Sequence, residues 1–447
     1  MRITFYLVKS TIVGALGGLL FGFDTAVIAG TTHELTRIYH LTPTTLGLTV
    51  SIALWGTVVG CLFAGVLGQK LGGREALRIM ALLYVVSAIG SALAWNWPAL
   101  VVFRFIGGLG IGGSSVLGPV YIAELAPAKW RGRLVGLFQI NIVLGILLAY
   151  LSNFLIGGMN LGAIEWRYEL GVAALPAVLF LGMLYGIPRS SRWLVTQSRL
   201  AEARAVLESM GSPDSDAELR EIHESIHFEK SAVSEPLFKQ RYKLPIILAI
   251  TIGMFNQLSG INAILYYLND IFLAAGFSKI SGNMQSVIVG AVNLAATIVG
   301  MSMIDKVGRK TLLLIGSVGT ACCLSGVAWI FLTRSHQSYL LWLLTSYITF
   351  FAISQGAVIW VYIAEVFPTR VRSKGQSLGS GAHWITNAVI SGLFPTLARH
   401  SGGTPFVFFA AMMVLQFIIV LFVYPETKGL TLEQLQTRLA PPEANDA

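Results

Sequence analysis

Long apolar segments are the feature that most constrains how this chain can fold. One of them, FVFFAAMMVLQFIIVLFVY, runs from Phe406 to Tyr424 without a charged residue. About 20 apolar residues are the length that an α-helix needs to cross a bilayer. Hydrophobic residues make up 55% of the 447 residues and charged residues only 12%, about half the charged share of a soluble domain. We therefore predict an all-α membrane protein rather than a large soluble protein with buried helices.

Charged or Gly/Pro-rich breaks divide the apolar segments into two sets of six, which predicts twelve transmembrane helices. The first set covers about 10–30, 46–68, 77–94, 99–123, 134–157 and 170–187. The second covers about 244–274, 284–304, 311–332, 340–364, 376–397 and 405–424. The predicted domains are an N-terminal six-helix bundle (1–187), an intracellular helical linker (188–243), a C-terminal six-helix bundle (244–424) and a cytosolic tail (425–447). A solvated linker without helices is the alternative for 188–243.

The distribution of Lys and Arg predicts the orientation in the membrane. Four short loops, after the second, fourth, eighth and tenth spans, hold twelve positive charges: Lys70, Arg74, Arg78, Lys129, Arg131, Arg133, Lys306, Arg309, Lys310, Arg370, Arg372 and Lys374. The loops on the other side hold single ones at most. Cytoplasmic loops are enriched in Lys and Arg, so we expect these loops, the linker and both termini in the cytoplasm. This bias also accounts for most of the net charge of +9, so no nucleic-acid partner is expected.

Two stretches of the chain repeat each other. YIAELAPAKWRGR begins at Tyr121 and YIAEVFPTRVRSK at Tyr362, with the same spacing from Glu to Pro to Arg. A second pair, KLGGREALRI from Lys70 and KVGRKTLLLI from Lys306, follows the second span of each half. Such internal repeats are typical of secondary transporters. Acidic and basic residues at matched cytoplasmic helix ends predict an inner gate of ion pairs, although plain positive-inside bias is the alternative; the candidates are Glu124, Arg131, Asp305, Arg309, Glu365 and Arg372.

The motifs along the chain resemble those of the sugar porter family of the major facilitator superfamily. They are GGLLFGFD, RFIGGLGIGGSSVLGPVYIAELAP, RGRLVGLFQ, NQLSGINAILYY, DKVGRK, YIAEVFP and PETKG, and they cover nearly the whole chain. The resemblance implies the major facilitator fold, with two pseudo-symmetric six-helix bundles. It also implies transport of a sugar by alternating access, as in facilitative glucose transporters and bacterial proton–sugar symporters.

Asp24 lies within the first span, where a carboxylate is costly and therefore a candidate functional residue. Arg104, near the start of the fourth span, is the predicted partner. Breaking such a pair, or drying its surroundings, favours protonation of the carboxyl group, which is a means of coupling protons to a conformational change. Family symporters have Asp at this place, so the resemblance favours proton coupling; a structural ion pair is the alternative.

Three amide side chains are close together in the seventh span: Asn256, Gln257 and Asn262. Gly260 lies between them and permits a kink that brings the amides to one cavity. Amides suit sugars because each offers both donors and an acceptor to hydroxyl groups. Hydrogen bonding between helices is the alternative.

The resemblance implies further sugar-contacting residues. Gln139 and Asn293 match the family's amides, and Trp360 and Trp384 match its pocket tryptophans; Asn387, Tyr266 and Tyr267 are weaker candidates. His383 stands where the family usually has Gln or Asn, and we expect it to act as a hydrogen-bonding side chain or as a second titratable group.

Other departures from the family pattern leave the sugar open. Asn256 replaces the usual Gln, and Gln69 and Gly73 stand where Asp and Arg are common. Ala352 and Ala357 replace the facilitators' Glu and the Pro of a G-P-x-x-W motif. PRSSRW, from Pro188 to Trp193, replaces the usual PESPR, so Arg189 stands in place of a glutamate.

Taken together, these patterns predict a secondary active transporter that imports a hexose or pentose by proton symport across a bacterial inner (plasma) membrane. A uniporter, a polyol substrate or a non-transporting sugar sensor are the alternatives. We expect no enzyme activity, no metal site and no cofactor other than the proton gradient. Both halves lie in one chain, so a monomer should suffice.

Overall fold

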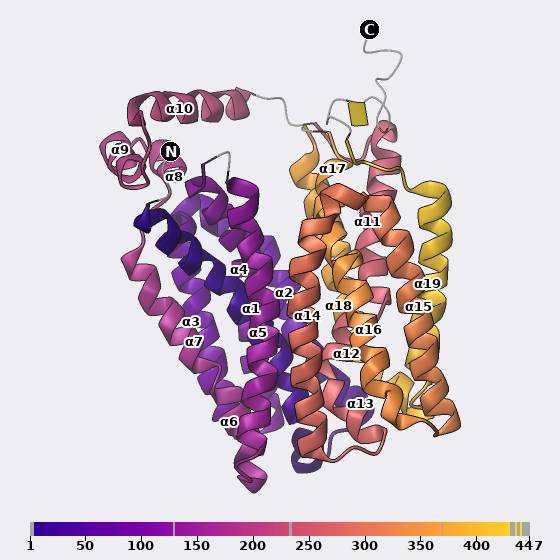
Figure 1. Cartoon of the computed structure of the whole chain (residues 1–447). Helices are drawn as coiled ribbons and strands as arrows, with labels where there is room; N and C mark the ends of the chain where they lie inside the picture. The colour runs from indigo at the N-terminus through magenta and orange to yellow at the C-terminus, as the bar shows by residue number, and fades with distance from the viewer. Residues whose placement is uncertain are drawn as a thin grey trace. The chain divides into compact units, whose positions relative to one another are not determined.

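The computed structural model describes residues 4–127, 130–231, 235–368, 370–429, 434–435 and 439. Lys129 and most of the predicted tail lie outside the described residues. The chain divides into two compact units: residues 1–34 with 52–233, and residues 35–51 with 234–447. The helices of both are labelled in Figure 1.

Ten α-helices make up the described part of the first unit. They are α1 (Phe5–Tyr39, whose end belongs to the second unit), α2 (Pro43–Leu71, likewise shared at its start), α3 (Gly73–Ala92), α4 (Trp97–Leu125), α5 (Arg131–Gly157), α6 (Glu165–Gly171), α7 (Ala174–Met183), α8 (Ser191–Thr196), α9 (Leu200–Ser209) and α10 (Ser215–Ser231). In this unit α3 packs along α4, α6 and α7. Close packing explains the glycine-rich run of α4, because a Cβ on Gly108 would lie 2.0 Å from the carbonyl oxygen of Ala53 in α2.

The predicted linker forms three helices that stay with the first unit. Helices α8, α9 and α10 share a small apolar core that includes Leu194, Ala203 and Ile226. Met210 joins this group to the main core of the first unit, where it clusters with Leu7 and Leu184. This segment is therefore helical, and it packs on the core of the first unit.

The second unit contains the remaining helices of the described chain. They are α11 (Lys243–Leu258), α12 (Ile261–Tyr266), α13 (Leu268–Ala274), α14 (Lys279–Val307), α15 (Arg309–Thr333), α16 (Leu340–Ile353), α17 (Gln355–Glu365), α18 (Arg372–His400) and α19 (Thr404–Val423). Here α11 packs against α18, and α15 packs against α16 and α19.

Eleven helical segments of the described chain are long and apolar enough to cross a membrane. They correspond to eleven of the twelve predicted spans. The twelfth prediction, 376–397, lies within α18, which has 29 residues and so is long enough at about 1.5 Å per residue. Helix α18 has Arg372 and Lys374 in its first turn and contains His383 and Asn387 farther along. These polar residues lower its mean hydropathy.

Two predicted spans are broken in the middle. The span predicted at 244–274 is divided after Leu258, where Gly260 has a φ of 84°; the kink expected at this glycine is confirmed. The span predicted at 340–364 is divided at Ser354, whose hydroxyl donates to the carbonyl oxygen of Phe350 at 2.5 Å. Broken membrane helices are common at the binding sites of secondary transporters.

We predict that Gly260→Ala destabilises the protein more than Gly276→Ala does. Both glycines have positive φ, so each substitution incurs backbone strain of about 1–2 kcal/mol. A Cβ at position 260 would also lie 2.3 Å from the Phe409 ring, whereas a Cβ at position 276 meets nothing within 4 Å. This overlap should add about 1–3 kcal/mol. Thermal unfolding in detergent, followed by circular dichroism, measures the difference; equal losses for the two variants would contradict the role of Phe409.

Candidate functional site

In the first unit, Asp24 on α1 and Arg104 on α4 are both buried, with 7% and 3% of their surface exposed. They interact electrostatically, but no ion pair of 4.0 Å or less joins them in the described structure. Oδ2 of Asp24 and Nε of Arg104 are buried atoms without a hydrogen-bond partner among the described residues. The structure thus brings the predicted pair into one buried region without direct contact. Oδ2 of Asp24 can therefore accept a proton or a hydrogen bond.

The surroundings of Asp24 come from α3 and α4. A Cβ on Gly107 would lie 3.5 Å from Oδ2 of Asp24 and 2.4 Å from the hydroxyl of Ser87. The Tyr84 hydroxyl lies 2.9 Å from that of Ser114, in hydrogen-bonding contact. Gln139, predicted from the resemblance, lies on α5 of the same unit and is partly buried.

In the second unit, the predicted amides form one hydrogen-bonded network, which we call the amide network: Asn256, Gln257, Asn262 and His383. Gln257 Nε2 donates to Asn256 Oδ1 at 3.0 Å and lies 3.2 Å from Nε2 of His383. Asn262 Nδ2 donates to Gln257 Oε1 at 3.0 Å. The last bond crosses the break at Gly260, so the two helical segments share one polar group.

Aromatic side chains lie beside the amide network. The His383 ring is 5.0 Å from the rings of both Trp360 and Trp384. Trp384 is buried, whereas Trp360 has 39% of its surface exposed. An indole that keeps an accessible face beside hydrogen-bonding groups is suited to packing on the C–H face of a sugar ring.

The remaining candidates lie near the amide network or elsewhere in the unit. Asn387 Nδ2 donates to the Tyr266 hydroxyl at 3.4 Å, and the Tyr267 hydroxyl donates to the carbonyl oxygen of Ser391 at 3.0 Å. The hydroxyl of Tyr267 therefore already has a structural bond. Asn293 is buried on α14.

The inner-gate candidates of the second unit are connected through Arg309. Its guanidinium donates twice to Glu365, at 2.8 and 3.2 Å, and lies 3.0 Å from Asp305 Oδ1. Arg372 instead donates from Nε to the carbonyl oxygen of Phe367 at 3.3 Å. The repeat singled out Glu365 and Arg372, but the geometry shows Arg309 as the partner of Glu365.

The candidates of the first unit are arranged differently. Glu124 is hydrogen-bonded to the side chain of Ser190 and interacts electrostatically with Arg192. Arg131 begins α5 and is exposed. In the repeat, Gly73 stands at the position of Arg309, so the described part of the first unit has no guanidinium at the matching place.

Glu426, in the PETKG motif, is a residue whose role the sequence did not reveal. Its carboxylate accepts four backbone N–H bonds: from Arg309, Thr427 and Lys428 on Oε1, at 2.9, 2.9 and 3.0 Å, and from Lys310 on Oε2 at 3.0 Å. It therefore caps the N-terminus of α15, where an anion is favoured. Burial alone would raise the pKa of Glu426, but these donors hold that pKa below the ordinary glutamate value. Thr427 adds a bond of 2.6 Å to Glu365.

The fold and these sites define a class, that of helical membrane proteins with buried polar groups in each of two units. The family model described as "Sugar (and other) transporter" matches residues 10–439. The chain is 34% identical to the D-xylose-proton symporter of Escherichia coli K12, over 98% of this chain and 96% of that protein. It is 35% identical to the arabinose-proton symporter of Bacillus subtilis, over 96% and 94%.

Solved structures give the same result. The chain matches the inward-open conformation of the xylose transporter XylE from E. coli with a TM-score of 0.86 and 33% identity, over 97% of this chain and all of that one. The chain belongs to the sugar transporter family of the major facilitator superfamily. It has the fold that the motifs implied, and it is a transporter rather than an enzyme.

We predict that Glu426→Gln destabilises the protein at neutral pH by about 1 kcal/mol, because a helix N-terminus loses its anion. The pKa of this carboxyl is lower in the folded than in the unfolded protein. Its contribution to stability is therefore complete above the unfolded pKa of about 4.3 and disappears as the pH falls through the lower folded pKa. Thermal unfolding of both proteins between neutral and acidic pH should show the difference shrinking in acid. Glu208→Gln on exposed α9 is the control; a pH-independent difference would argue against the cap.

Proposed function

We propose that this protein is a proton-coupled monosaccharide symporter that works by alternating access. The observation that carries the proposal is the carboxylate of Asp24, which is buried in a membrane helix. Its Oδ2 has no hydrogen-bond partner among the described residues. An intramembrane carboxylate is costly as an anion, and the Arg104 charge offsets this cost. A conformational change that alters the distance between them would bind or release a proton.

The substrate class follows from the amide network and its aromatic neighbours. Amides, an imidazole and an accessible indole face match the alternating hydroxyl and C–H surfaces of a monosaccharide. Two relatives carry the names of xylose and arabinose symporters, which supports a pentose. We infer that Gln257, Asn262 and Asn256 bind the hydroxyl groups and that His383 adds a further hydrogen bond. Asn293, Asn387 and Trp384 of the same unit contribute further contacts, and Gln139 stays a candidate of the first unit from the resemblance.

The location and driving force belong to the same proposal. The positive loops support an orientation with both termini in the cytoplasm, and the bacterial relatives support an inner (plasma) membrane. The proton gradient is the proposed driving force, with no bound cofactor, and one chain is the proposed transporting unit. The Arg309–Glu365 contact is proposed to stabilise one conformation of the inner gate and to break in another.

We predict that Asp24→Asn abolishes sugar accumulation but leaves equilibrium exchange, because an amide cannot take up the coupled proton. Labelled xylose and arabinose uptake into proteoliposomes, with and without an inward proton gradient, measures both activities. Asp216→Asn, on exposed α10, should behave as the unchanged protein. Gradient-driven accumulation by Asp24→Asn would rule out Asp24 as the coupling site, and uptake that ignores the gradient in the unchanged protein would make it a uniporter.

We predict that Gln257→Ala weakens sugar binding by about 10- to 100-fold, since lost hydrogen bonds in a buried site cost about 1–3 kcal/mol. Equilibrium binding to detergent-solubilised protein measures this without transport. Gln285→Ala is the matched control. Gln285 lies in the first two turns of α14, where its side chain donates to the Ser281 hydroxyl at 3.3 Å. Equal affinities of Gln257→Ala and the control would place the sugar elsewhere.

A further inference from the structure

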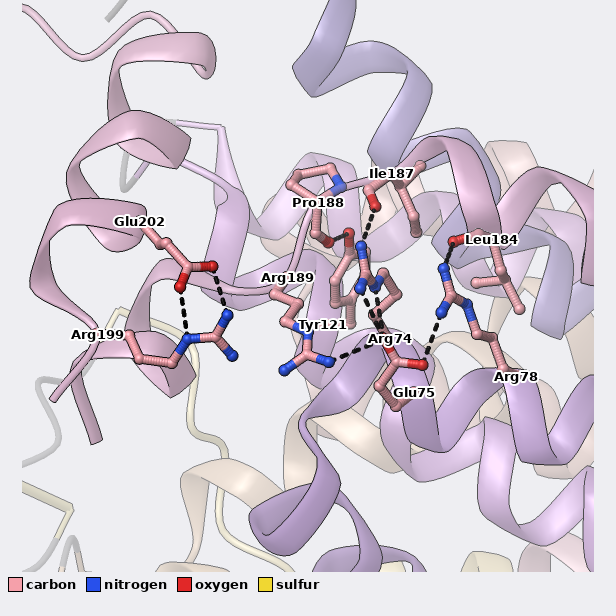
Figure 2. Close-up of polar contacts among 10 residues, drawn as sticks. All are labelled: Arg74, Glu75, Arg78, Tyr121, Leu184, Ile187, Pro188, Arg189, Arg199 and Glu202. Atoms are coloured by element: carbon pink, nitrogen blue, oxygen red, sulfur yellow. Dashed lines mark hydrogen bonds and ion pairs between the residues drawn. The ribbon is translucent and has the colours of Figure 1, made fainter. Parts of the chain in front are cut away.

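Three arginines surround one glutamate at the end of the first unit that faces the linker helices. Figure 2 shows Arg74, Arg78 and Arg189 directed at Glu75; we call these four residues the Glu75 cluster. The guanidinium nitrogens lie 2.7, 2.7 and 3.4 Å from the carboxylate oxygens, in that order. Two of the arginines come from α3 and the third from the segment before α8, so the cluster joins elements distant in the sequence.

The Glu75 cluster has more positive charge than negative charge, and more hydrogen-bond donors than acceptors. Three guanidinium groups carry five N–H donors each, against a single carboxylate. Arg74 and Arg78 also donate to the carbonyl oxygens of Ile187 and Leu184, at 3.0 and 3.2 Å. Nε of Arg78 is buried and has no hydrogen-bond partner among the described residues. The cluster therefore has an excess of two positive charges.

The neighbouring charges do not remove this excess. Glu124 is hydrogen-bonded to Ser190 and interacts with Arg192, so that carboxylate has its own cation. Arg189 is therefore a third cation beside Arg74 and Arg78, and Glu75 is the one carboxylate that all three contact among the described residues.

The lipid-facing surface of α3 begins next to the cluster. Its exposed apolar residues recur at helical spacing: Ile79, Leu82, Val86 and Ile89, followed by Leu93. The neighbouring α7 exposes Leu175, Val178 and Leu179. Arg78 stacks on the exposed ring of Tyr185, 4.0 Å from its centroid. From Arg78 to the end of α3 at Ala92 is about 21 Å along the helix, and the exposed Trp95 follows three residues later. This length covers most of the hydrocarbon thickness of about 30 Å, and aromatic rings mark the membrane interfaces.

We propose that the Glu75 cluster binds the phosphate of an anionic phospholipid whose acyl chains lie along the apolar stripe of α3 and α7. The guanidinium groups of Arg78 and Arg189 supply fork-shaped donors for phosphate oxygens. The net charge of the cluster favours an anionic lipid such as phosphatidylglycerol over a zwitterionic one. The apolar stripe beginning one residue from Arg78 favours a lipid over a free phosphate ion. This inference rests on the membrane location of the chain and not on the sugar or the proton.

The test is native mass spectrometry of the detergent-solubilised full chain, titrated with phosphatidylglycerol or phosphatidylcholine in the absence of sugar. The unchanged protein should bind one phosphatidylglycerol more tightly than any phosphatidylcholine. Arg78→Gln with Arg189→Gln should weaken phosphatidylglycerol binding by about thirty-fold, since each cation near the headgroup contributes a factor of about five. The same double variant should leave phosphatidylcholine binding unchanged.

Two controls keep the result interpretable. Arg199→Gln with Arg204→Gln removes two arginines from exposed ion pairs on α9, and should have no effect. Arg189→Lys retains the charge and should retain most of the binding. Arg189→Gln alone should weaken binding about five-fold and serves if the double variant does not fold. Equal affinity for the two lipids, or an effect of the α9 variants equal to that of the cluster variants, would overturn the proposal. Competition by millimolar inorganic phosphate or soluble glycerophosphoglycerol would likewise overturn it in favour of a free-anion site.

Discussion

The cost of placing polar groups in hydrocarbon is the constraint on which the rest of this structure depends. It forces the backbone into helices and confines polar side chains to places where another polar group can reach them. Gln257 meets Asn256, Asn262 and His383, and Arg309 meets Glu365 and Asp305. Asp24 and Arg104 lie farther apart, and one buried polar atom of each has no hydrogen-bond partner among the described residues.

The same constraint explains which parts of the fold the sequence predicts well. Span positions follow from apolar length, and the break at Gly260 follows from a residue that accepts positive φ. The break at Ser354 was not predictable from composition, because a serine inside an apolar run usually bonds to its own helix without ending it. Helix α18 was predicted as a span because charged or Gly/Pro-rich breaks bound its apolar residues, although its polar residues weaken the hydropathy signal.

The candidate sites show a similar division. Amides clustered within a few residues of a glycine were identifiable locally, since helix geometry and one kink bring them together. Partners from distant segments were not. The repeat directed attention to Glu365 with Arg372, but Arg309 comes from another helix and Glu426 from beyond the last span. The cluster around Glu75 likewise depends on Arg189, which lies over a hundred residues away in the chain.

The cap formed by Glu426 has a consequence for where the second bundle ends. Pro425 accepts a hydrogen bond from the Tyr362 hydroxyl at 3.2 Å, and Lys428 donates from Nζ to the carbonyl oxygen of Lys306. The residues just after the last span therefore hold the ends of α14, α15 and α17 together through hydrogen bonds. A chain shortened to Tyr424 would keep every membrane helix of this unit yet expose the first turn of α15. The second unit therefore depends on the chain at least as far as Lys428. Because Leu435 and Leu439 are also buried in its core, any fused domain or affinity tag belongs beyond Leu439.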